Sequence, residues 1–259
     1  MDQSSFIRPG NFDLFNVKIT QIQMMIDRGY NIPESEKAML NMTKEQFISY
    51  LEKLVTGEVD NEWVPYLDSI NFPESSKYTE RTLLGNVYSK RDENDKRDKR
   101  CMVIFVDQDG GQQVIKIIAD AIVVIVEGIE TGIKYDELIL VSKIPFSTVS
   151  KKCISDLRYT DHWVFFDKEL IFNVSKHVYV PKHTLMSREE SIVIKKIYKH
   201  MEQISEDDPV VKYYGWKVGG VVLIERDVSD LDMMIDKYIA KRVIVRTTAV
   251  VNKGKSGKK

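Results

Sequence analysis

Cysteine is scarce in this chain of 259 residues, which has only Cys101 and Cys153. Two cysteines so far apart can form neither a zinc knuckle nor a disulfide framework, and their scarcity favours a reducing compartment. Long apolar runs are also missing, because the longest, residues 114–126, has 13 residues and contains two charged side chains. Such a run is too short to span a bilayer. Residues 1–10 lack the pattern of a secretion signal, so we expect an intracellular protein that makes no contact with membranes.

The chain has no excess of either charge. It contains 38 Lys and Arg against 39 Asp and Glu, a formal net charge of −1. A protein that binds nucleic acid through its overall charge needs more basic than acidic residues. The composition therefore argues against a free-standing nucleic-acid-binding protein of this kind, but it does not exclude a local basic patch. Hydrophobic residues make up 43% of the chain and aromatics 10%. This composition is sufficient for a buried core and excludes disorder over most of the length.

Motifs that would carry catalysis or bind a metal are also lacking. The sequence has no Gly-x-Ser-x-Gly nucleophile turn and no His-Glu-x-x-His zinc motif. His177 and His183 have no third ligand at a useful spacing. No lysine follows an Asp or Glu by two positions, which removes the Asp/Glu-x-Lys signature of metal-dependent nucleases. We therefore predict no catalytic residue, no metal and no cofactor, and keep a nuclease-like DNA-processing enzyme only as an alternative.

The first hundred residues predict two helices followed by irregular chain. Apolar residues recur at helical spacing from Phe12 to Ile26, and Gly29 is a plausible stop. Thr43-x-x-Gln46 forms a capping-box pattern that predicts the start of a second helix. Residues 57–88 show no periodicity and are predicted to be irregular. Ten of the eleven residues 90–100 are charged, with both signs mixed, which is typical of a solvated loop.

The middle of the chain predicts alternating strands and helices. Apolar runs at 101–106 and 137–142 indicate buried strands, and the strand-like pattern returns at 163–174. A turn at 107–111 and helices at 114–129 and 147–157 are expected between them. Strand, helix and strand in this order imply a βαβ unit with parallel pairing. The fold class predicted for the whole chain is α+β.

The last third predicts a smaller α+β module. Ser187 and Glu190 form a second capping box before a helix whose predicted face includes Tyr198 and Met201. A turn is expected at 208–209, a strand at 221–224 and another at 239–251. Residues 252–259 are predicted to be a frayed basic tail.

Four linked motifs in this last third resemble a known family. They are His177-Val-Tyr-Val180-Pro181-Lys-His183, Leu185-Met-Ser187-Arg-Glu189-Glu190, Asp208-Pro209-Val210-Val-Lys212-Tyr213-Tyr214-Gly215, and Gly219-Gly220-Val221-Val222-Leu-Ile224-Glu-Arg226. In order and spacing they are similar to the assembly domain of the fifth subunit shared by eukaryotic nuclear RNA polymerases, which has a counterpart in the archaeal enzyme. The family pattern is His-x-x-Val-Pro-x-His, Ser/Thr-x-Glu-Glu, Asp-Pro-Val-x-x-Tyr-x-Gly and Gly-x-Val-Val-x-Ile-x-Arg.

The resemblance implies a non-catalytic subunit of a multisubunit DNA-directed RNA polymerase that acts in transcription. Nucleotide addition would belong to the two largest subunits, and the partners would be the largest subunit and other polymerase subunits. Residues at motif positions are expected to take part in this subunit docking: His177, Val180, Pro181, His183, Glu190, Asp208, Pro209, Tyr213, Tyr214, Gly215, Gly220 and Arg226.

A weaker resemblance extends upstream. Asp27-Arg28-Gly29-Tyr30 is similar to the opening of the family's jaw domain, which archaeal members lack. The resemblance therefore implies a jaw domain at residues 1–175 and an assembly domain at 176–259. The family places a loop and helix start of the jaw beside downstream duplex DNA, where lysines and hydroxyls would contact phosphates. The residues implied are Lys143, Ser147, Thr148, Ser150, Lys151 and Lys152.

Three segments depart from the family pattern. Residues 57–100 look expanded, residues 227–240 are acidic and lack the usual closing motif, and the basic tail is extra. These departures favour a divergent lineage and are compatible with a large DNA virus that carries its own polymerase. The expected location is the nucleus for a cellular protein, and the virion or the replication site in the host cell for a viral one. The rewritten 227–240 segment also keeps open a scaffold that has left the polymerase.

Overall fold

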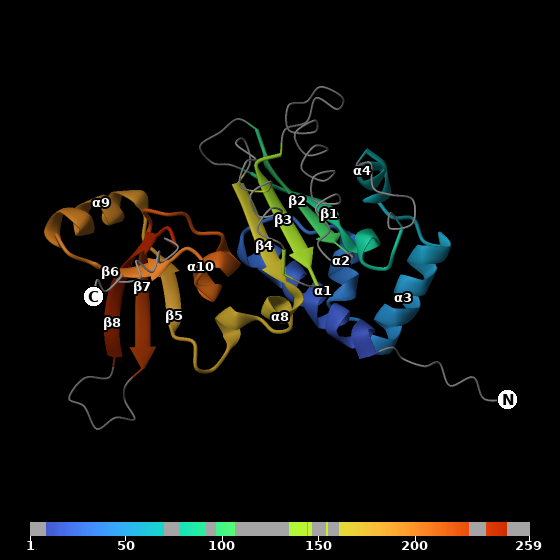
Figure 1. The fold of residues 1–259 in the computed structure, drawn as a ribbon, viewed down its shortest axis with the longest axis horizontal. Helices are drawn as coiled ribbons and strands as arrows, with labels where there is room; N and C mark the ends of the chain where they lie inside the picture. Colours follow the sequence, from blue (N-terminus) through green and yellow to red (C-terminus); the bar gives the residue numbers. More distant parts are fainter. Residues whose placement is uncertain are drawn as a thin grey trace, which may run out of the picture. The chain divides into compact units, whose positions relative to one another are not determined.

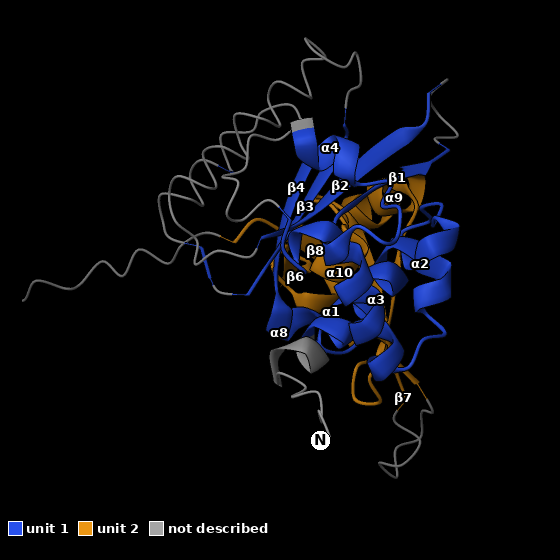
Figure 2. Ribbon diagram, turned by 90° about the vertical axis from the view of Figure 1, so that its right-hand side faces the viewer, with its two compact units in different colours: residues 1–173 blue, residues 174–259 orange. Residues whose placement is uncertain are grey.

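The computed structural model describes residues 9–69, 78–91, 97–106, 135–143, 145–146, 154, 161–227 and 237–247. The chain forms two compact units, residues 1–173 and residues 174–259 (Figure 2). Each unit is described below by itself. Both contain helices and a four-stranded sheet, which confirms the α+β class. The assignment of residues 1–175 to a jaw and of 176–259 to an assembly domain stays a prediction.

The first unit begins with the helices α1 (Pro9–Asp27), α2 (Glu34–Met39), α3 (Lys44–Thr56) and α4 (Val64–Ser69). The predicted stop after α1 is confirmed, because Gly29 has a φ of +79°, a conformation that glycine adopts without steric cost. The predicted capping box of α3 is confirmed too. The Thr43 hydroxyl accepts from Gln46 N at 3.3 Å, and the Gln46 amide oxygen accepts from Thr43 N at 2.8 Å.

The prediction of irregular chain at 57–88 is wrong. This segment contains α4, a short 3-10 helix, η1 (Thr82–Leu84), and the start of a strand. Trp63 is fully buried, and its indole N–H donates to the carbonyl of Thr82 at 2.8 Å. A Cβ at Gly85 would lie 2.5 Å from this indole ring, so only glycine fits there. Elements this short are held by such contacts, which leave no periodicity in the sequence.

The sheet of the first unit has the strand order β1-β2-β3-β4 (Figure 1). Its strands are β1 (Asn86–Lys90), β2 (Lys99–Val106), β3 (Glu137–Ser142) and β4 (Asp161–Phe166). Pairing of β2 with β3 and of β3 with β4 is parallel, as predicted, and β1 joins β2 antiparallel. The turn at 107–111 and the helix at 114–129 lie outside the described residues, as does the helix at 147–157 apart from Ile154.

Two further expectations at the borders of this sheet are corrected. The charge run at 90–100 is not wholly a loop, because Lys90 on β1 pairs with Lys99 on β2, next to the segment that connects the two strands. The strand-like pattern at 163–174 stops at Phe166 and is followed by α8 (Asp167–Leu170). The Glu169 side chain accepts from the Phe166 backbone N–H at 2.8 Å, which starts the helix at this point.

The second unit is built on a sheet with the order β5-β7-β8-β6. Its elements are η2 (Val174–Lys176), β5 (Lys182–Leu185), α9 (Arg188–Ile197), β6 (Glu202–Ser205), α10 (Pro209–Tyr214), β7 (Val221–Asp227) and β8 (Lys237–Val245). Its core contains a cluster of Ile204, Val211, Val222, Ile224 and Ile244, with Trp216 and Ala240 packed against it. Val210, Tyr213 and Val221 are buried as well.

Three expectations for the second unit change. The predicted turn at 208–209 is the start of α10, because the Asp208 carboxylate accepts from the backbone N–H of Val210 at 2.9 Å and caps the helix. The helix that follows Ser187 ends at Ile197, so the prediction that it includes Tyr198 and Met201 is wrong. The last strand spans 237–245 instead of 239–251, and the tail at 252–259 lies outside the described residues.

Candidate docking site

Five of the predicted docking residues line one hollow on the second unit. It has a volume of about 340 Å³. We call it the His177 hollow, and the residues from the predicted set that line it are His177, Val180, Pro181, His183 and Tyr214. Its other lining residues are Ser175, Lys176, Val178, Lys182 and Val210. The structure thus brings the first family motif and the end of α10 together, although about 30 residues separate them along the chain.

The loop beside the hollow is shaped by its own backbone. The N–H of Val180 donates to the carbonyl of His177 at 2.9 Å, which closes a tight turn. Pro181 restricts the chain after this turn, and its carbonyl oxygen lies 2.7 Å from Nδ1 of His183. This contact holds the His183 ring against the loop. The backbone N–H of Tyr179 donates to Nδ1 of His177 at 3.3 Å, so local contacts position both histidine rings.

The turn directs two large apolar side chains into solvent. Val178 is 85% exposed and Tyr179 is 87% exposed. Neither residue was predicted from the sequence to take part in docking, although their place next to Pro181 in a loop is the signal that could have found them. Val178 also lines the hollow, and exposed apolar side chains in and beside a hollow are typical of protein–protein contact sites.

The charge around the hollow is positive. Lys176 and Lys182 line it together with the two histidines, and no acidic side chain is among its lining residues. Glu225 lies nearby, and one of its carboxylate oxygens is 3.7 Å from Nζ of Lys182. Because Lys182 remains 73% exposed, this pair leaves its ammonium group accessible to a partner. The hollow therefore offers apolar contact and positive charge together.

The remaining predicted docking residues shape the unit and do not line the hollow. Asp208 and Pro209 start α10, Tyr213 is 2% exposed, and Gly215 ends the helix with a φ of +67°. Tyr214, by contrast, lines the hollow and stacks on Trp216, with ring centroids 4.7 Å apart.

Three more residues of the set lie on other elements. Glu190 caps α9, with its carboxylate accepting from Ser187 N at 2.9 Å. Gly220 packs tightly, since a Cβ there would lie 3.0 Å from a Leu185 methyl group. Arg226 is exposed on β7. A direct docking role for these residues stays a prediction.

The predicted DNA-proximal residues are only partly within the described structure. Lys143 follows β3 directly and is exposed. Ser147, Thr148, Ser150, Lys151 and Lys152 lie outside the described residues. Their proximity to DNA stays a prediction.

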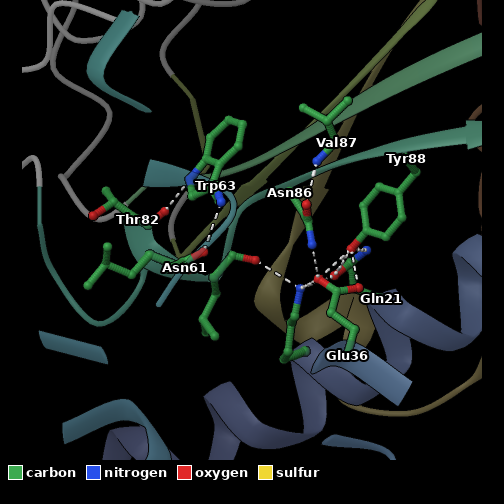
Figure 3. Close-up of polar contacts among 11 residues, drawn as sticks. Gln21, Glu36, Asn61, Trp63, Thr82, Asn86, Val87 and Tyr88 are labelled. Atoms are coloured by element: carbon green, nitrogen blue, oxygen red, sulfur yellow. Dashed lines mark hydrogen bonds and ion pairs between the residues drawn. The ribbon is translucent and has the colours of Figure 1, made fainter. Parts of the chain in front are cut away.

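A buried polar cluster in the first unit was not predicted from the sequence. Glu36 accepts from Nζ of Lys18 at 2.6 Å and from the Tyr88 hydroxyl at 2.6 Å, while Asn86 donates to it at 3.0 Å. Lys18 also donates to Gln21 at 2.9 Å and to the carbonyl of Leu84 at 2.8 Å. Figure 3 shows Gln21, Glu36, Asn86 and Tyr88 converging on one point.

Burial sets the ionisation of this cluster. It lowers the pKa of Lys18, and the neighbouring Glu36 carboxylate opposes that change. Burial, followed by the Glu36 charge, raises the pKa of Tyr88 well above its usual value. All three donors of the Lys18 ammonium have acceptors inside the unit, so the cluster joins α1, α2 and β1 and presents no group to a substrate.

Neither a metal centre nor a membrane span is found in the described parts of the chain. Among those residues, no three or more His, Cys, Asp or Glu side chains gather where they could hold a metal ion. No described helix combines the length and the apolar character that crossing a bilayer requires.

Comparison with known proteins identifies the family. A model of the C-terminal domain of RNA polymerase Rpb5 matches residues 172–240. A stretch of 59 residues is 41% identical to the DNA-directed RNA polymerase subunit Rpo5 of Pyrococcus horikoshii, covering 21% of this chain and 72% of that protein. The chain belongs to the RNA polymerase subunit 5 family.

Other members of the subunit 5 family extend the similarity. RPABC1 of Caenorhabditis elegans, a subunit of DNA-directed RNA polymerases I, II and III, is 27% identical over 243 residues, 90% of this chain and 96% of that protein. The match to rpabc1 of Dictyostelium discoideum is 41% identical over 66 residues but covers only 34% of that protein. Because the C. elegans match is longer than the second unit, the similarity reaches into the first unit as well.

Family membership confirms the resemblance on which the function was predicted. The expected class, a polymerase subunit that is not the catalytic one, is confirmed at the level of the family. Residues 227–240 were expected to depart from the family pattern. The family model nevertheless matches the chain as far as residue 240, so the similarity continues through this segment.

Proposed function

We propose that this chain is the fifth, non-catalytic subunit of a multisubunit DNA-directed RNA polymerase, and that its second unit docks on the largest subunit. The observation that carries the docking proposal is the grouping of motif residues around the His177 hollow, next to two exposed side chains: Val178, which lines the hollow, and Tyr179, which follows it in the chain. Two apolar side chains more than four-fifths exposed are unfavourable in water, and burying them against a partner is favourable. A partner segment with an acidic residue would complement Lys176 and Lys182.

The experiment is co-purification of the tagged full-length chain from its native source, followed by mass spectrometry. Recovery in equal amounts with two very large polymerase subunits supports the proposal. Val178→Ser combined with Tyr179→Ser is expected to reduce this recovery at least tenfold, since apolar anchors at the centre of an interface often contribute about 2 kcal/mol or more.

The matched control removes apolar surface elsewhere. Val55 on α3 is 47% exposed, and Val55→Ser is expected to leave recovery unchanged. Equal recovery with the Val178/Tyr179 double variant and with Val55→Ser would contradict docking through this loop. Recovery of the chain without polymerase subunits would favour the scaffold that has left the polymerase. Metal-dependent DNA cleavage by the purified chain would favour the nuclease alternative.

The first unit is proposed to contribute the lower jaw, near downstream duplex DNA. The proposal rests on the resemblance and on the exposure of Lys143 directly after β3. Changing Lys143, Lys151 and Lys152 to Gln is expected to weaken the binding of downstream DNA by the assembled polymerase. The slope of log K against log salt should fall by about one for each phosphate that no longer has a lysine beside it. The control changes Lys37, Lys44 and Lys53 to Gln. A slope with the first triple variant that equals the slope with this control would contradict the proposed position near DNA.

The matched relatives are subunits of eukaryotic and archaeal RNA polymerases. For a chain encoded by a eukaryotic cell, we propose that the complex acts in the nucleus. A viral origin would place it in the virion or at the replication site in the host cell. The identity of the large subunits in the same co-purification distinguishes the two, because their sequences reveal the genome that encodes them.

A further inference from the structure

β8 is longer than the strand beside it, which leaves part of one edge unpaired. On one side, β8 pairs with β7 from Lys237 to Val243. On the other side, β6 pairs only with Arg242 to Val245. In the part of the chain that the structure describes, no strand pairs with this second side of residues 237–241. We call residues 237–241 the open edge.

The backbone groups of the open edge can be assigned a direction from the bonds further along β8. Ile244 N donates to Gly220 O and Ile244 O accepts from Gly219 N, both at 2.9 Å, so the backbone of Ile244 faces β7. Val245 O accepts from Glu206 N at 2.9 Å, so the backbone of Val245 faces β6. Along a strand, the N–H and C=O groups of successive residues point alternately to its two sides. The N–H and C=O of Lys237 and Ile239 therefore point away from β7, into the open edge.

The side chains at the open edge are apolar on both faces of the sheet. Tyr238 is 48% exposed and Ile239 is 53% exposed. Consecutive residues of a strand point to opposite faces, so these two side chains flank the edge from both sides. An exposed apolar edge with unpaired backbone groups is a template for another strand and a hazard for aggregation, which proteins normally cover.

The charge at this side of β8 indicates what kind of strand fits. Where β6 covers β8, acidic residues lie beside basic ones: Glu202 is 3.1 Å from Arg242, and Glu206 is 3.9 Å from Arg246. On the open edge, Lys237 and Lys241 are also basic, but they lie on the sheet face opposite to Arg242, and Nζ of Lys241 lies 5.6 Å from the centre of the Tyr198 ring. A strand that extends the β6 position would thus meet positive charge and two apolar side chains.

We propose that the open edge of β8 accepts an extended segment of another polymerase subunit as an additional strand. The segment carries an acidic residue near Lys237 or Lys241 and apolar residues over Tyr238 and Ile239. Backbone hydrogen bonds supply affinity, and the alternating side chains supply specificity. This inference rests on the proposed function, because it takes the partner from the same complex, but it uses a surface apart from the His177 hollow.

Hydrogen exchange at single-residue resolution tests the proposal on the full-length chain, free and in the purified polymerase. The amide of Ile239 is expected to exchange at least about 100-fold more slowly in the complex, since it gains a hydrogen bond there. The amide of Ala240 faces β7 and serves as an internal reference for the stability of the unit. Equal exchange of Ile239 in the two states would overturn the proposal. Slow exchange of the Ile239 amide already in the free chain, together with a dimer in sedimentation, would assign the open edge to a second copy of this chain. That result would also overturn the proposal.

A pair of variants separates backbone from side chain at one position. Ile239→Pro removes the N–H that points into the open edge, where proline is tolerated because the ladder to β7 keeps its hydrogen bonds. Ile239→Thr retains that N–H and a β-branched shape. We expect Ile239→Pro to reduce recovery of polymerase subunits at least tenfold, and Ile239→Thr to reduce it less than threefold. Similar recovery with both variants would count against strand addition, and the exchange experiment remains decisive should Ile239→Pro fail to fold.

Failure of the inference and failure of the proposed function are distinguishable. Should the unaltered chain recover no polymerase subunits, the proposed function fails and this inference fails with it. Should it recover them while the Ile239 amide stays as fast as in the free chain, only the strand addition fails.

Discussion

The two units of this chain use their apolar residues in different ways. In the first unit, all six residues from Cys101 to Val106 on β2 are buried, as are Leu138 to Val141 on β3. In the second unit, the core cluster has five residues, while Val178, Tyr179, Ile197, Tyr198, Tyr238 and Ile239 are each at least 48% exposed. The central strands of the first unit are enclosed by packing within that unit, although Phe172 at its end is 52% exposed. The second retains apolar surface that a partner would cover.

Ion pairs show the same difference. Lys18 and Glu36 in the first unit are 1% and 3% exposed, and Arg81 and Asp167 are 9% and 15% exposed. In the second unit, Arg242 and Glu202 are 35% and 64% exposed. A buried pair is costly to break because it leaves a charge without water or partner, whereas an exposed pair contributes little. Buried ion pairs are thus found in the first unit, which also has exposed pairs such as Lys37–Glu34, whereas the pairs described in the second unit all lie at its surface.

Breaking the buried pair is expected to have the largest effect. Lys18→Met keeps the length of the side chain but leaves Glu36 buried without its cation. We expect a loss of about 3–5 kcal/mol in the free energy of unfolding, measured by chemical denaturation. Lys18→Met combined with Glu36→Gln should recover at least half of this loss, because the neutral amide can still bond to Tyr88 and Asn86.

The matched variant in the second unit is Arg242→Met. Its partner Glu202 stays hydrated, so we expect a change below about 1 kcal/mol. A loss with Lys18→Met no larger than with Arg242→Met would remove the contrast between the two units. That outcome would also show that the Lys18 cluster does not stabilise the fold.

A cavity in the small core of the second unit is expected to have the next largest effect. Ile244 is 1% exposed in the five-residue cluster, and Ile244→Ala removes three carbon atoms from it. We expect a loss of about 2–4 kcal/mol in the free energy of unfolding of this unit, followed by denaturation of the full-length chain. A loss below about 1 kcal/mol would mean that the core of the second unit is not tightly packed without a partner.

The smallest effect is expected on the apolar surface of α9. Val193 is 54% exposed, and Val193→Ala is expected to change the free energy of unfolding by less than about 0.5 kcal/mol. A loss comparable to that of Ile244→Ala would show that this surface is covered within the free chain. The second unit would then resemble the first instead of contrasting with it.

Patterns of residues close together in the chain gave the most reliable predictions of secondary structure. Capping boxes at Thr43 and Ser187 placed the starts of α3 and α9, because a cap depends on residues three positions apart. The apolar runs placed β2 and β3 for the same reason, since a buried strand needs only a short stretch of Val, Ile and Leu. The family motifs led to the family, and the predicted docking residues of the first motif converge with Tyr214, at the end of α10, on one hollow.

Other features could not be found in this way because distant residues create them. Lys18 lies on a helix whose sequence would allow it to face water, yet acceptors from α2 and from the chain before β1 hold it in the core. Trp63 and Gly85 lie in the segment 57–88, whose sequence shows no hydrophobic periodicity. The close packing of Gly85 against the Trp63 ring helps to hold this segment in place. The predicted apolar stripe of α1 included Ile26, which is 44% exposed, so the sequence indicated the helix better than its buried face.

By itself, the sequence determined the α+β class, the capped helices, the buried strands and the family, because each depends on residues close together in the chain or on motifs of fixed spacing. Only the tertiary structure decided which charges are buried, which apolar residues stay in solvent, and where β8 lacks a neighbour. These properties depend on what packs against a residue from elsewhere in the chain. Burial and strand pairing are relations between distant segments, and no local pattern encodes them.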